Sequence, residues 1–302
     1  MLDLNFVLDE TGREKLVARF GAGAEAWCTA LPEMVKLYCL RWDLELEEAL
    51  AGNSSRVYTG RQHGNRGVVL KLTPDLAIAT EEAIALRAWA ATPHAVDLLD
   101  ADLDAGALLL ENIEPGTKIS DEPHVPPAGE VAELLTGLRD AARYDHGQLP
   151  PLAQGMEPMF SRIGELLSNP GVSPFVAPQL LDDGYRKARE LASTGPAGLL
   201  HGDLHLANIL RAGRTRGLVA IDPRPGVGDP AFDAIDWTLD RVTSMAEVHE
   251  RIERLSGLVP FLDRDRLWGW CQATAAALAI LLLRRRPPDP TTQLLLKIAA
   301  ST

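Results

Sequence analysis

The hydrophobic pattern divides the chain into a first part rich in strands and a second part rich in helices. In the first part, short apolar runs bounded by turn residues predict five strands. The runs are residues 43–50 (which also fit a short amphipathic helix), 57–59, 68–72, 96–99 and 107–110. Helical spacing predicts a helical segment before them, at about residues 12–40, and one main helix among them, at 75–91. We therefore expect a small five-stranded antiparallel sheet with one main helix.

The second part has the spacing of helices almost throughout. Apolar residues recur every three or four positions in six segments, at about residues 128–144, 152–168, 176–192, 231–256, 264–284 and 289–300. Strand-like runs occur at Ala207–Arg211 and Leu218–Ile221. The pattern predicts an α+β fold with a small lobe of residues 1–112 and a larger, mostly helical lobe of residues 113–302.

Charge and cysteine content narrow the class of protein. The 302-residue chain has a net charge of −12, from 30 Lys and Arg against 42 Asp and Glu. A general nucleic-acid-binding protein carries the opposite balance, so that class is disfavoured. An acidic surface attracts a cationic small substrate over long range, although it also serves solubility alone. The three cysteines form no CxxC pair, which argues against a disulfide framework and a zinc site.

Two segments bear on where the protein resides. The first five residues are acidic and lack a cationic region followed by an apolar one, so no secretory signal is expected. Residues 267–283 are strongly apolar, but Gln272 and Thr274 interrupt them, and the continuous part is shorter than the ~20 residues that span a bilayer. We expect a buried core helix there, and a soluble, cytoplasmic protein with no membrane or protein partner evident.

A polar segment between two apolar runs holds side chains suited to phosphoryl transfer. Asp203 follows the first run, Asn208 stands five positions later, and Asp222 ends the second run. Phosphoryl transfer needs a carboxylate that accepts the proton of the attacking hydroxyl, and oxygen ligands for Mg²⁺. We predict Asp203 as the base and Asn208 and Asp222 as the metal ligands. The alternative is a loop in which these residues only cap turns.

A lysine in the first part suggests the other half of an ATP site. Lys71 lies near the end of an apolar run, where a buried side chain needs a charged partner. In kinases such a lysine contacts the α- and β-phosphates and pairs with a helix glutamate. Glu82 is the first candidate for that partner and Glu81 the second. On its own, Lys71 also fits a surface lysine of an edge strand.

Two further segments have positions that suit ATP. The loop Gly52–Ser55 lies between the first two predicted strands. In this loop, Ser54 and Ser55 are candidates to hold phosphate through backbone N–H groups. It matches neither phosphate-loop motif, so a plain turn is an equal alternative. After the last strand, the backbone groups of Glu111 and Ile113 are candidates to bind adenine.

Residues around the central motif are candidates for supporting roles. His201 is expected to hold the loop backbone. Asp233 is expected to accept backbone N–H bonds near His201, while Asp229 either braces the loop or caps a helix that begins at Pro230. Asp236 and Trp237 are candidates for a cationic substrate pocket, with an ion-paired face as the alternative.

The motifs together resemble those of the aminoglycoside phosphotransferase family, and within it streptomycin 6-kinases and hydroxyurea phosphotransferases. The resemblance rests on His201–Asn208, Ile221–Pro223 and Gly228–Asp233, and runs from about Asp43 to at least Asp236. It implies a protein-kinase-like bilobal fold, ATP and Mg²⁺ as cofactors, and a small cationic or polar substrate. It also implies the roles given above for Lys71, Asp203, Asn208 and Asp222.

The function expected first is phosphorylation of streptomycin at its 6-hydroxyl, or of hydroxyurea, with inactivation of the antibiotic. One alternative is a metabolic kinase of the same fold, for choline, homoserine or a sugar. Another is a non-catalytic nucleotide-binding regulator, which would lack one of the four motif residues, and none is missing. Protein kinase activity is disfavoured because the stretch from Asp222 to Asp229 is short and contains no Ala-Pro-Glu.

Overall fold

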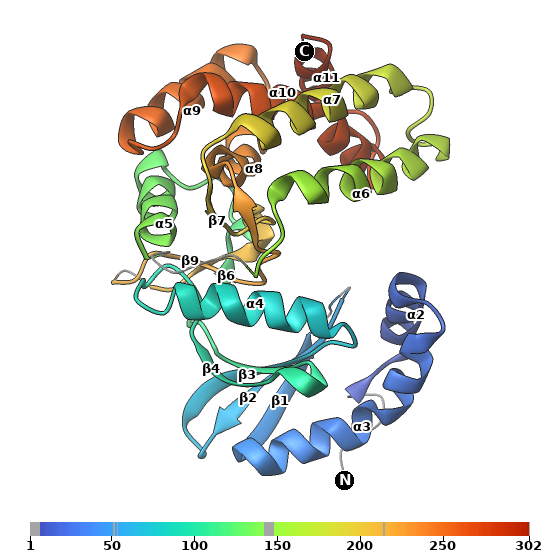
Figure 1. The fold of residues 1–302 in the computed structure, drawn as a ribbon, viewed down its shortest axis with the longest axis vertical. Helices are drawn as coiled ribbons and strands as arrows, with labels where there is room; N and C mark the ends of the chain where they lie inside the picture. Colours follow the sequence, from blue (N-terminus) through green and yellow to red (C-terminus); the bar gives the residue numbers. More distant parts are fainter. Residues whose placement is uncertain (1–6, 51, 53, 142–147, 214, 302) are drawn as a thin grey trace. The chain divides into compact units, whose positions relative to one another are not determined.

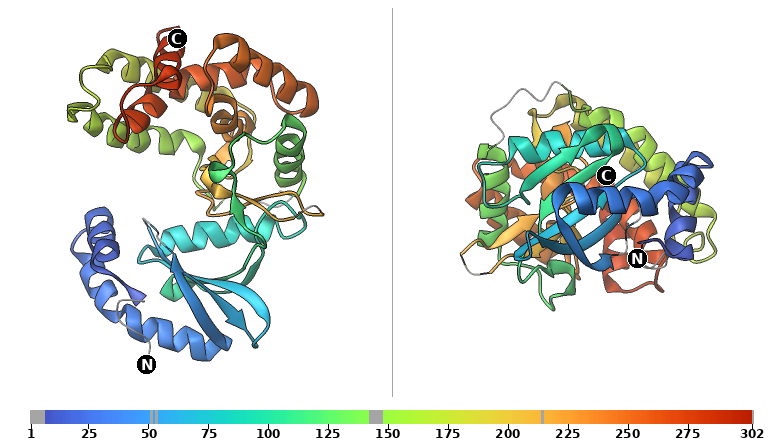
Figure 2. Two further views of the ribbon diagram at one scale, coloured as in Figure 1. Left: turned by 180° about the vertical axis from the view of Figure 1, so that it is seen from behind. Right: turned by 90° about the horizontal axis from the view of Figure 1, so that it is seen from below.

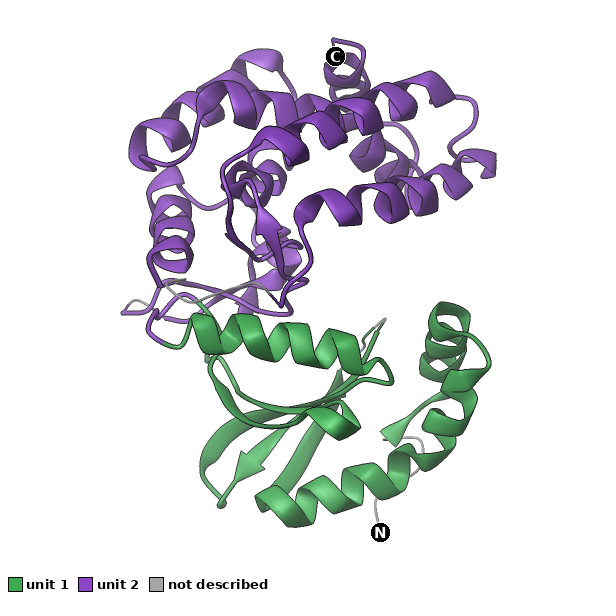
Figure 3. Ribbon diagram, viewed as in Figure 1, with its two compact units in different colours: residues 1–90, 95–116 green, residues 91–94, 117–302 purple. Residues whose placement is uncertain are grey.

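The computed structural model describes residues 7–50, 52, 54–141, 148–213 and 215–301. They form two compact units (Figure 3). Unit 1 comprises residues 1–90 and 95–116, and unit 2 comprises residues 91–94 and 117–302. Each unit has a hydrophobic core of its own.

Unit 1 is built on a five-stranded sheet in which every neighbouring pair is antiparallel. Its strands are, in spatial order, β1 (Leu44–Leu50), β2 (Arg56–Gln62), β3 (Arg66–Leu72), β5 (Ala107–Glu111) and β4 (Leu98–Asp102). The predicted sheet is confirmed, and the ambiguous segment 43–50 is a strand. The expected strand at 96–99 begins two residues later and extends to Asp102.

Helices cover both faces of this sheet (Figures 1 and 2). The helix α3 (Gly23–Trp42) packs on one face, where Leu31, Val35 and Tyr38 join Val68 and Leu70 in the core. The helix α4 (Leu76–Ala88) lies on the other face. Because successive strand residues point to opposite faces, the residue after Leu70 points toward α4.

The single helical segment expected at 12–40 is in fact two helices. The first, α2 (Glu10–Phe20), begins at Asp9, whose side chain accepts from the Gly12 N–H. It ends at Gly21, where φ is 74° and the Gly21 N–H bonds to the Val17 carbonyl. Glycine adopts this left-handed conformation without strain, so the chain turns here before α3 begins.

Unit 2 is mostly helical, as predicted, and α10 lies in its core. Its principal helices are α5 (Ala128–Ala141), α6 (Leu152–Gly164), α7 (Pro178–Thr194), α9 (Met245–Leu258), α10 (Arg264–Leu283) and α11 (Pro290–Ala299). Among the described residues, α10 alone has the length and hydropathy to cross a membrane, and 72% of its apolar window is buried inside the protein. It therefore serves as a core helix. Of the helix expected at 128–144, residues 142–144 lie outside the described residues.

The long helix expected at 231–256 was a wrong prediction. The segment forms the 3₁₀ helix η5 (Pro230–Ala234), the short helix α8 (Ile235–Leu239) and then α9. Between α8 and α9 the chain turns at Arg241, where φ is 55°, and the Arg241 side chain donates to the carbonyls of Ser120 and Glu122. Ser244 then caps α9 by accepting from the Glu247 N–H.

Short strands in unit 2 flank the central motif. The predicted runs appear as β8 (Ile209–Arg211) and β9 (Leu218–Ala220), which form a sheet with β6 (Thr117–Lys118). A second sheet pairs β7 (Gly198–Leu200) with β10 (Gly226–Gly228). The prediction missed β6, β7 and β10, because two or three residues are too few to show a period.

Candidate active site

A buried ion pair occupies the face of unit 1 between the sheet and α4. The Nζ atom of Lys71, on β3, lies 2.8 Å and 2.6 Å from the two carboxylate oxygens of Glu82, on α4. Lys71 is 4% exposed and Glu82 is fully buried. Of the two glutamates that the sequence left open, Glu82 is thus the partner. Both charges meet a partner in the interior, as buried charges must.

The loop between β1 and β2 is anchored next to the end of β3. Ser54 and Ser55 are buried, and the Ser54 carbonyl accepts a hydrogen bond of 2.9 Å from the Thr73 hydroxyl. A Cβ atom on Gly52 would lie 2.4 Å from the Ser55 carbonyl oxygen, so the tight path requires glycine. Asn53, in the middle of this loop, lies outside the described residues.

The candidate adenine-binding segment follows β5 directly. The Glu111 N–H donates to the Asp97 carbonyl at 3.1 Å, and the Asn112 N–H donates to the Gly67 carbonyl at 3.2 Å. A bond from Glu111 to adenine would therefore have to use its carbonyl oxygen. Ile113 is buried and lies just outside the strand.

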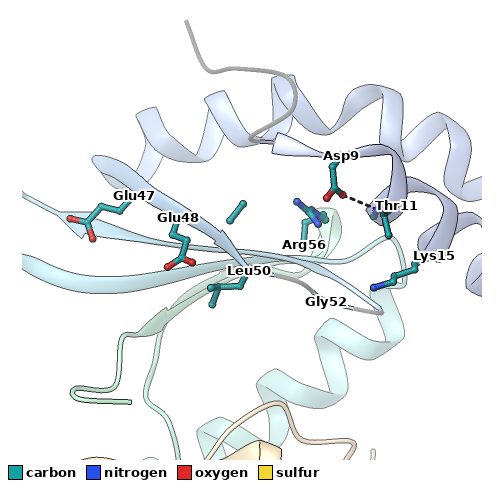
Figure 4. A pocket seen from close by; sticks show the side chains of 10 residues that line it. Asp9, Thr11, Lys15, Glu47, Glu48, Leu50, Gly52 and Arg56 are labelled. Atoms are coloured by element: carbon teal, nitrogen blue, oxygen red, sulfur yellow. Dashed lines mark hydrogen bonds between the residues drawn. The ribbon is translucent and has the colours of Figure 1, made fainter. Parts of the chain in front are cut away.

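A pocket of about 410 Å³ in unit 1 is distinct from these residues (Figure 4). The start of α2 supplies one wall, with Asp9 and Lys15, and the end of β1 supplies another, with Glu48. Among the described residues of the predicted nucleotide loop, Gly52 alone lines this pocket. Its lining mixes both signs of charge and offers no set of groups aimed at a single ligand.

In unit 2, the central motif brings Asp203 and Asn208 together. The chain leaves β7 at Leu200, passes through the loop, and forms the 3₁₀ turn η4 (Leu206–Asn208) before β8. The Asn208 amide nitrogen donates to the Asp203 carbonyl at 2.9 Å and to its Oδ2 at 3.3 Å. The Ile221 N–H donates to the Asn208 carbonyl at 2.9 Å. This bond ties the loop to the end of β9, immediately before Asp222.

Asp222 occupies an unusual backbone conformation. Its φ of 53° lies in the left-handed region, which aspartate tolerates better than most residues but at an energetic cost. The strained turn continues to Arg224, whose N–H donates to the His201 carbonyl at 2.8 Å. The Asp222 side chain is 40% exposed and stands 3.9 Å from the Arg224 guanidinium. The turn thus keeps Asp222 beside the loop that carries Asp203.

His201 and Gly202 fix the backbone just before Asp203. His201 is 1% exposed; its Nε2–H donates to the Ile221 carbonyl at 3.0 Å, and its Nδ1 accepts from the Asp203 N–H at 3.4 Å. One donor and one acceptor correspond to a neutral imidazole. Gly202 has a φ of 76°, and a Cβ atom there would lie 2.0 Å from the Arg224 carbonyl oxygen. Glycine is therefore required at this position.

Asp233 accepts both backbone donors that precede Asp203. Its carboxylate oxygens lie 2.7 Å from the His201 nitrogen and 2.9 Å from the Gly202 nitrogen. Burial raises the pKa of Asp233 to about 6, and these two N–H groups act in the opposite direction. Asp229, four residues earlier, caps η5 by accepting from the Ala231 N–H at 3.1 Å.

The electrostatic setting of Asp203 favours proton acceptance. Desolvation raises its pKa above the ordinary value; Asp222 acts in the same direction, while His205, Arg224 and the bond from Asn208 lower it. The His205 Nε2 atom stands 3.8 Å from the Asp203 Oδ2. Because 45% of the Asp203 side chain is exposed, a substrate hydroxyl can reach it. A carboxylate with a raised pKa is the stronger base.

The two candidate substrate residues, Trp237 and Asp236, differ in their hydrogen bonding. Trp237 is 5% exposed, and its indole N–H donates to the Pro126 carbonyl at 2.9 Å. Trp237 thus packs in the core of unit 2. Burial raises the pKa of Asp236 to about 6, with Asp203 adding to the increase. No hydrogen-bond donor in the described part of the chain reaches the Asp236 carboxylate.

The oxygen donors of unit 2 suit a hard cation. Within the described ranges, no group of three or more His, Cys, Asp or Glu side chains is arranged around a common metal position. Asn208 and Asp222 offer an amide oxygen and a carboxylate beside one loop. Mg²⁺ binds through one or two protein oxygens together with substrate phosphates, so this donor set fits it.

Comparison with known proteins agrees with this geometry. A family model described as aminoglycoside/hydroxyurea antibiotic resistance kinase matches residues 41–284. A streptomycin 6-kinase of Streptomyces glaucescens is 32% identical over 265 residues, which cover 83% of this chain and 82% of that protein. A hydroxyurea phosphotransferase of Kitasatospora aureofaciens is 32% identical over 260 residues, which cover 83% of this chain and 72% of that protein.

A solved structure supports the fold. The crystal structure of a choline kinase from Streptococcus pneumoniae superposes with a TM-score of 0.61 at 16% identity, covering 89% of this chain and all of that one. The likeness confirms the expected kinase-like α+β fold. The resemblance drawn from the motifs is confirmed by the family model and the two relatives.

Proposed function

The chain belongs to the aminoglycoside/hydroxyurea antibiotic resistance kinase family, and we propose that it transfers the γ-phosphate of ATP to a hydroxyl of a streptomycin-type aminoglycoside. Its named relatives are phosphotransferases, and it is an enzyme of that kind. The observation that carries the proposal is the loop in which Asp203, held by Asn208 and preceded by two backbone N–H groups bonded to Asp233, keeps an exposed carboxylate.

Asp203 is the residue that acts on the substrate. Its carboxylate orients the attacking hydroxyl and accepts its proton as the hydroxyl oxygen bonds to the γ-phosphorus, while the bond from the γ-phosphorus to the β-phosphate oxygen breaks and ADP leaves. Asn208 and Asp222 are the residues that would hold Mg²⁺. When bound there, Mg²⁺ would supply positive charge that offsets the negative charge developing on the phosphate during transfer. His201 and Asp233 keep the loop backbone in the geometry that this step needs.

Unit 1 supplies the residues that bind the nucleotide. Lys71 is proposed to contact the α- and β-phosphates, with Glu82 fixing its ammonium group in place. The loop with Ser54 and Ser55 is proposed to cover the phosphates through backbone N–H groups. The segment from Glu111 to Ile113 is proposed to bind adenine. In this division, residues 1–112 bind the nucleotide and residues 113–302 carry the chemistry and the substrate site.

The substrate class follows from Asp236. Its carboxylate has no hydrogen-bond donor among the described residues, and the Asp203 and Asp240 carboxylates add negative charge around it. A desolvated carboxylate of this kind is stabilised by a ligand cation that donates hydrogen bonds, above all a guanidinium. Streptomycin carries guanidinium groups, while hydroxyurea carries no charge. The net charge of −12 also favours a cationic acceptor, because it attracts positive charge over long range. We place this reaction in the cytoplasm.

A panel of acceptors tests the proposal. The protein is incubated with ATP, Mg²⁺ and, in separate reactions, streptomycin, hydroxyurea, a deoxystreptamine aminoglycoside and choline, and ADP release is measured. We expect the highest kcat/KM with streptomycin. Hydroxyurea is the second candidate because one relative with 32% identity bears that name. Faster turnover of choline, with none of streptomycin or hydroxyurea, would reject the proposed substrate class.

A further inference from the structure

Asp229 is a buried carboxylate held by donors from two elements. It is 2% exposed, and its Oδ1 caps η5 through the Ala231 N–H. Its Oδ2 accepts from the Arg266 Nε at 2.6 Å and from the Trp270 indole N–H at 2.8 Å. Arg266 and Trp270 stand one turn apart on α10, so both reach the same oxygen atom. The carboxylate thus links η5 to the core helix of unit 2.

Two more contacts strengthen this link. The Arg266 NH2 group donates to the Leu191 carbonyl near the end of α7 at 2.6 Å, which fixes the guanidinium from a second side. Phe232, on η5, packs edge-on against the Trp270 ring, with the ring centroids 5.2 Å apart and the planes at 80°. The helix α10 therefore contacts η5 in two ways: it binds the Asp229 carboxylate at the start of η5, and it packs against the Phe232 ring.

The segment held in this way is the one that holds the catalytic loop. Asp233, on η5, accepts from the backbone N–H groups of His201 and Gly202, and Asp203 is the next residue along the chain. A 3₁₀ helix of five residues has weak internal hydrogen bonds, so its position depends on what it packs against. Arg266 is hydrogen-bonded to Asp229, the backbone of η5 joins Asp229 to Asp233, and Asp233 is hydrogen-bonded to the backbone beside Asp203.

We propose that Arg266 and Trp270 are positioning residues for phosphoryl transfer: by holding Asp229 they fix η5, and through Asp233 they fix the loop that carries Asp203. The inference rests on the proposed role of Asp203 as the base. Neither side chain touches the reacting atoms. Their contribution is the orientation of the carboxylate, to which a transition state is more sensitive than ground-state binding.

Arg266→Gln tests the charged link, with Arg264→Gln as the matched control on the same helix. Arg264 pairs with Glu253 at the surface and makes no contact with Asp229. We expect Arg266→Gln to lower kcat about tenfold while KM for ATP and for the acceptor stays within about twofold, because a small misplacement of the base acts on the transition state. Arg264→Gln is expected to leave both constants unchanged.

Trp270→Phe provides a milder test that keeps the ring and removes the indole donor. Its control is Trp268→Phe, since Trp268 packs against His249 and not against Asp229. We expect kcat to fall about threefold in Trp270→Phe and to stay unchanged in the control. Arg266→Lys, which keeps a donor for Asp229 but loses the fork to Leu191, is expected to recover part of the lost kcat.

Amide hydrogen exchange separates positioning from stability and from the proposed function. In Arg266→Gln we expect faster exchange in a peptide containing His201 and Gly202, with exchange in α6 and α11 unchanged. An even increase over all of unit 2, or a kcat equal to that of the Arg264 control, would overturn the proposal. If Arg266→Gln does not fold, Arg266→Lys and Trp270→Phe decide by the same criteria. If the wild type turns over no acceptor, the proposed function fails, while exchange still shows whether α10 holds the loop.

Discussion

The two units hold their functional groups in opposite ways. In unit 1, Lys71 and Glu82 extend from a regular strand and a regular helix and form an ion pair that is sealed from solvent. In unit 2, Asp203 and Asp222 stand on irregular segments, and their side chains are 45% and 40% exposed. The lysine proposed to bind phosphate is thus fixed by its own partner, and the carboxylate proposed as the base is fixed by hydrogen bonds to the backbone beside it.

Because of this difference, we expect substitutions in the two units to change different kinetic constants. A carboxylate that must meet a substrate cannot be enclosed, so its orientation has to come from neighbours such as His201 and Asp233. A lysine that only holds phosphates can be locked by a buried partner. Substitutions at Asp203 and in the loop that carries it should therefore lower kcat, whereas substitutions of the ion pair in unit 1 should chiefly weaken nucleotide binding.

Asp203→Asn should have the largest effect. The amide cannot accept the hydroxyl proton, so we expect kcat to fall by about 10²- to 10⁴-fold. The Kd for ATP, measured by isothermal titration, should stay within about twofold, because the side chain acts on the acceptor. Asp265→Asn, an exposed carboxylate on α10, is the control. Retained turnover in Asp203→Asn would remove this residue from the chemistry.

Gly202→Ala should lower kcat next most strongly. A Cβ atom would lie 2.0 Å from the Arg224 carbonyl oxygen, so the loop has to move at the residue before Asp203. We expect a loss of about 10²-fold in kcat. Gly213→Ala is a matched control, since Gly213 has a φ of 77° and open space around it. Equal losses in the two variants would mean that backbone strain, and not the clash, is responsible.

Glu82→Gln should act on the nucleotide. The change leaves the Lys71 ammonium buried without its counter-ion, so we expect a loss of stability of about 3 kcal/mol and a KM for ATP raised about tenfold. Thermal unfolding and steady-state kinetics measure the two effects. The same change at the neighbouring Glu81 is expected to have little effect on KM. A fall in kcat with KM for ATP unchanged would contradict the division between the units.

Asp236→Asn should have the smallest effect on rate and should stabilise the protein. Burial raises the pKa of Asp236 from 3.8 to about 6, so between these pH values the folded state keeps a proton that the unfolded chain has lost. Wild-type stability therefore falls as the pH rises through this window. We expect the Asn variant to be more stable by about 1 kcal/mol at pH 8, with no gain at pH 4.

The kinetic consequence of Asp236→Asn distinguishes the substrates. The KM for streptomycin should rise about fivefold, because a charge-assisted bond to a cation is lost, while turnover of uncharged hydroxyurea should not change. Asp203, Asp240 and His205 face the same carboxylate and are kept intact in the variant. A KM that changes equally for both acceptors would exclude recognition of a cation by Asp236.

The regular parts of the molecule were readable from the sequence. Lys71 stands near the end of the apolar run that forms β3, which made it a candidate for a buried lysine with a charged partner, and the predicted helix offered Glu82 first and Glu81 second. The order of Asp203, Asn208 and Asp222 indicated phosphoryl transfer before any contact was known. The sheet, the burial of Lys71 and its pairing with Glu82 are confirmed, whereas the roles of Asp203, Asn208 and Asp222 stay predictions.

The remainder depends on contacts between distant residues. The helix breaks between α8 and α9, where Arg241 donates hydrogen bonds to the carbonyls of Ser120 and Glu122. Hydrophobic periodicity does not predict such bonds between distant residues. The burial of Trp237 and its bond to the Pro126 carbonyl also depend on a residue far away in the chain. Arg266 and Trp270 donate hydrogen bonds to Asp229, which lies 37 and 41 positions earlier in the sequence. The spacing of these residues does not predict the two bonds.

We propose that this chain moves a phosphate from ATP to a hydroxyl of a streptomycin-type acceptor. Phosphorus NMR of a reaction containing the wild-type protein, ATP, Mg²⁺ and streptomycin tests it directly. We expect a new phosphate monoester resonance that grows in step with ADP and is absent with Asp203→Asn. Release of ADP with inorganic phosphate and unmodified streptomycin, or no consumption of ATP, would contradict it.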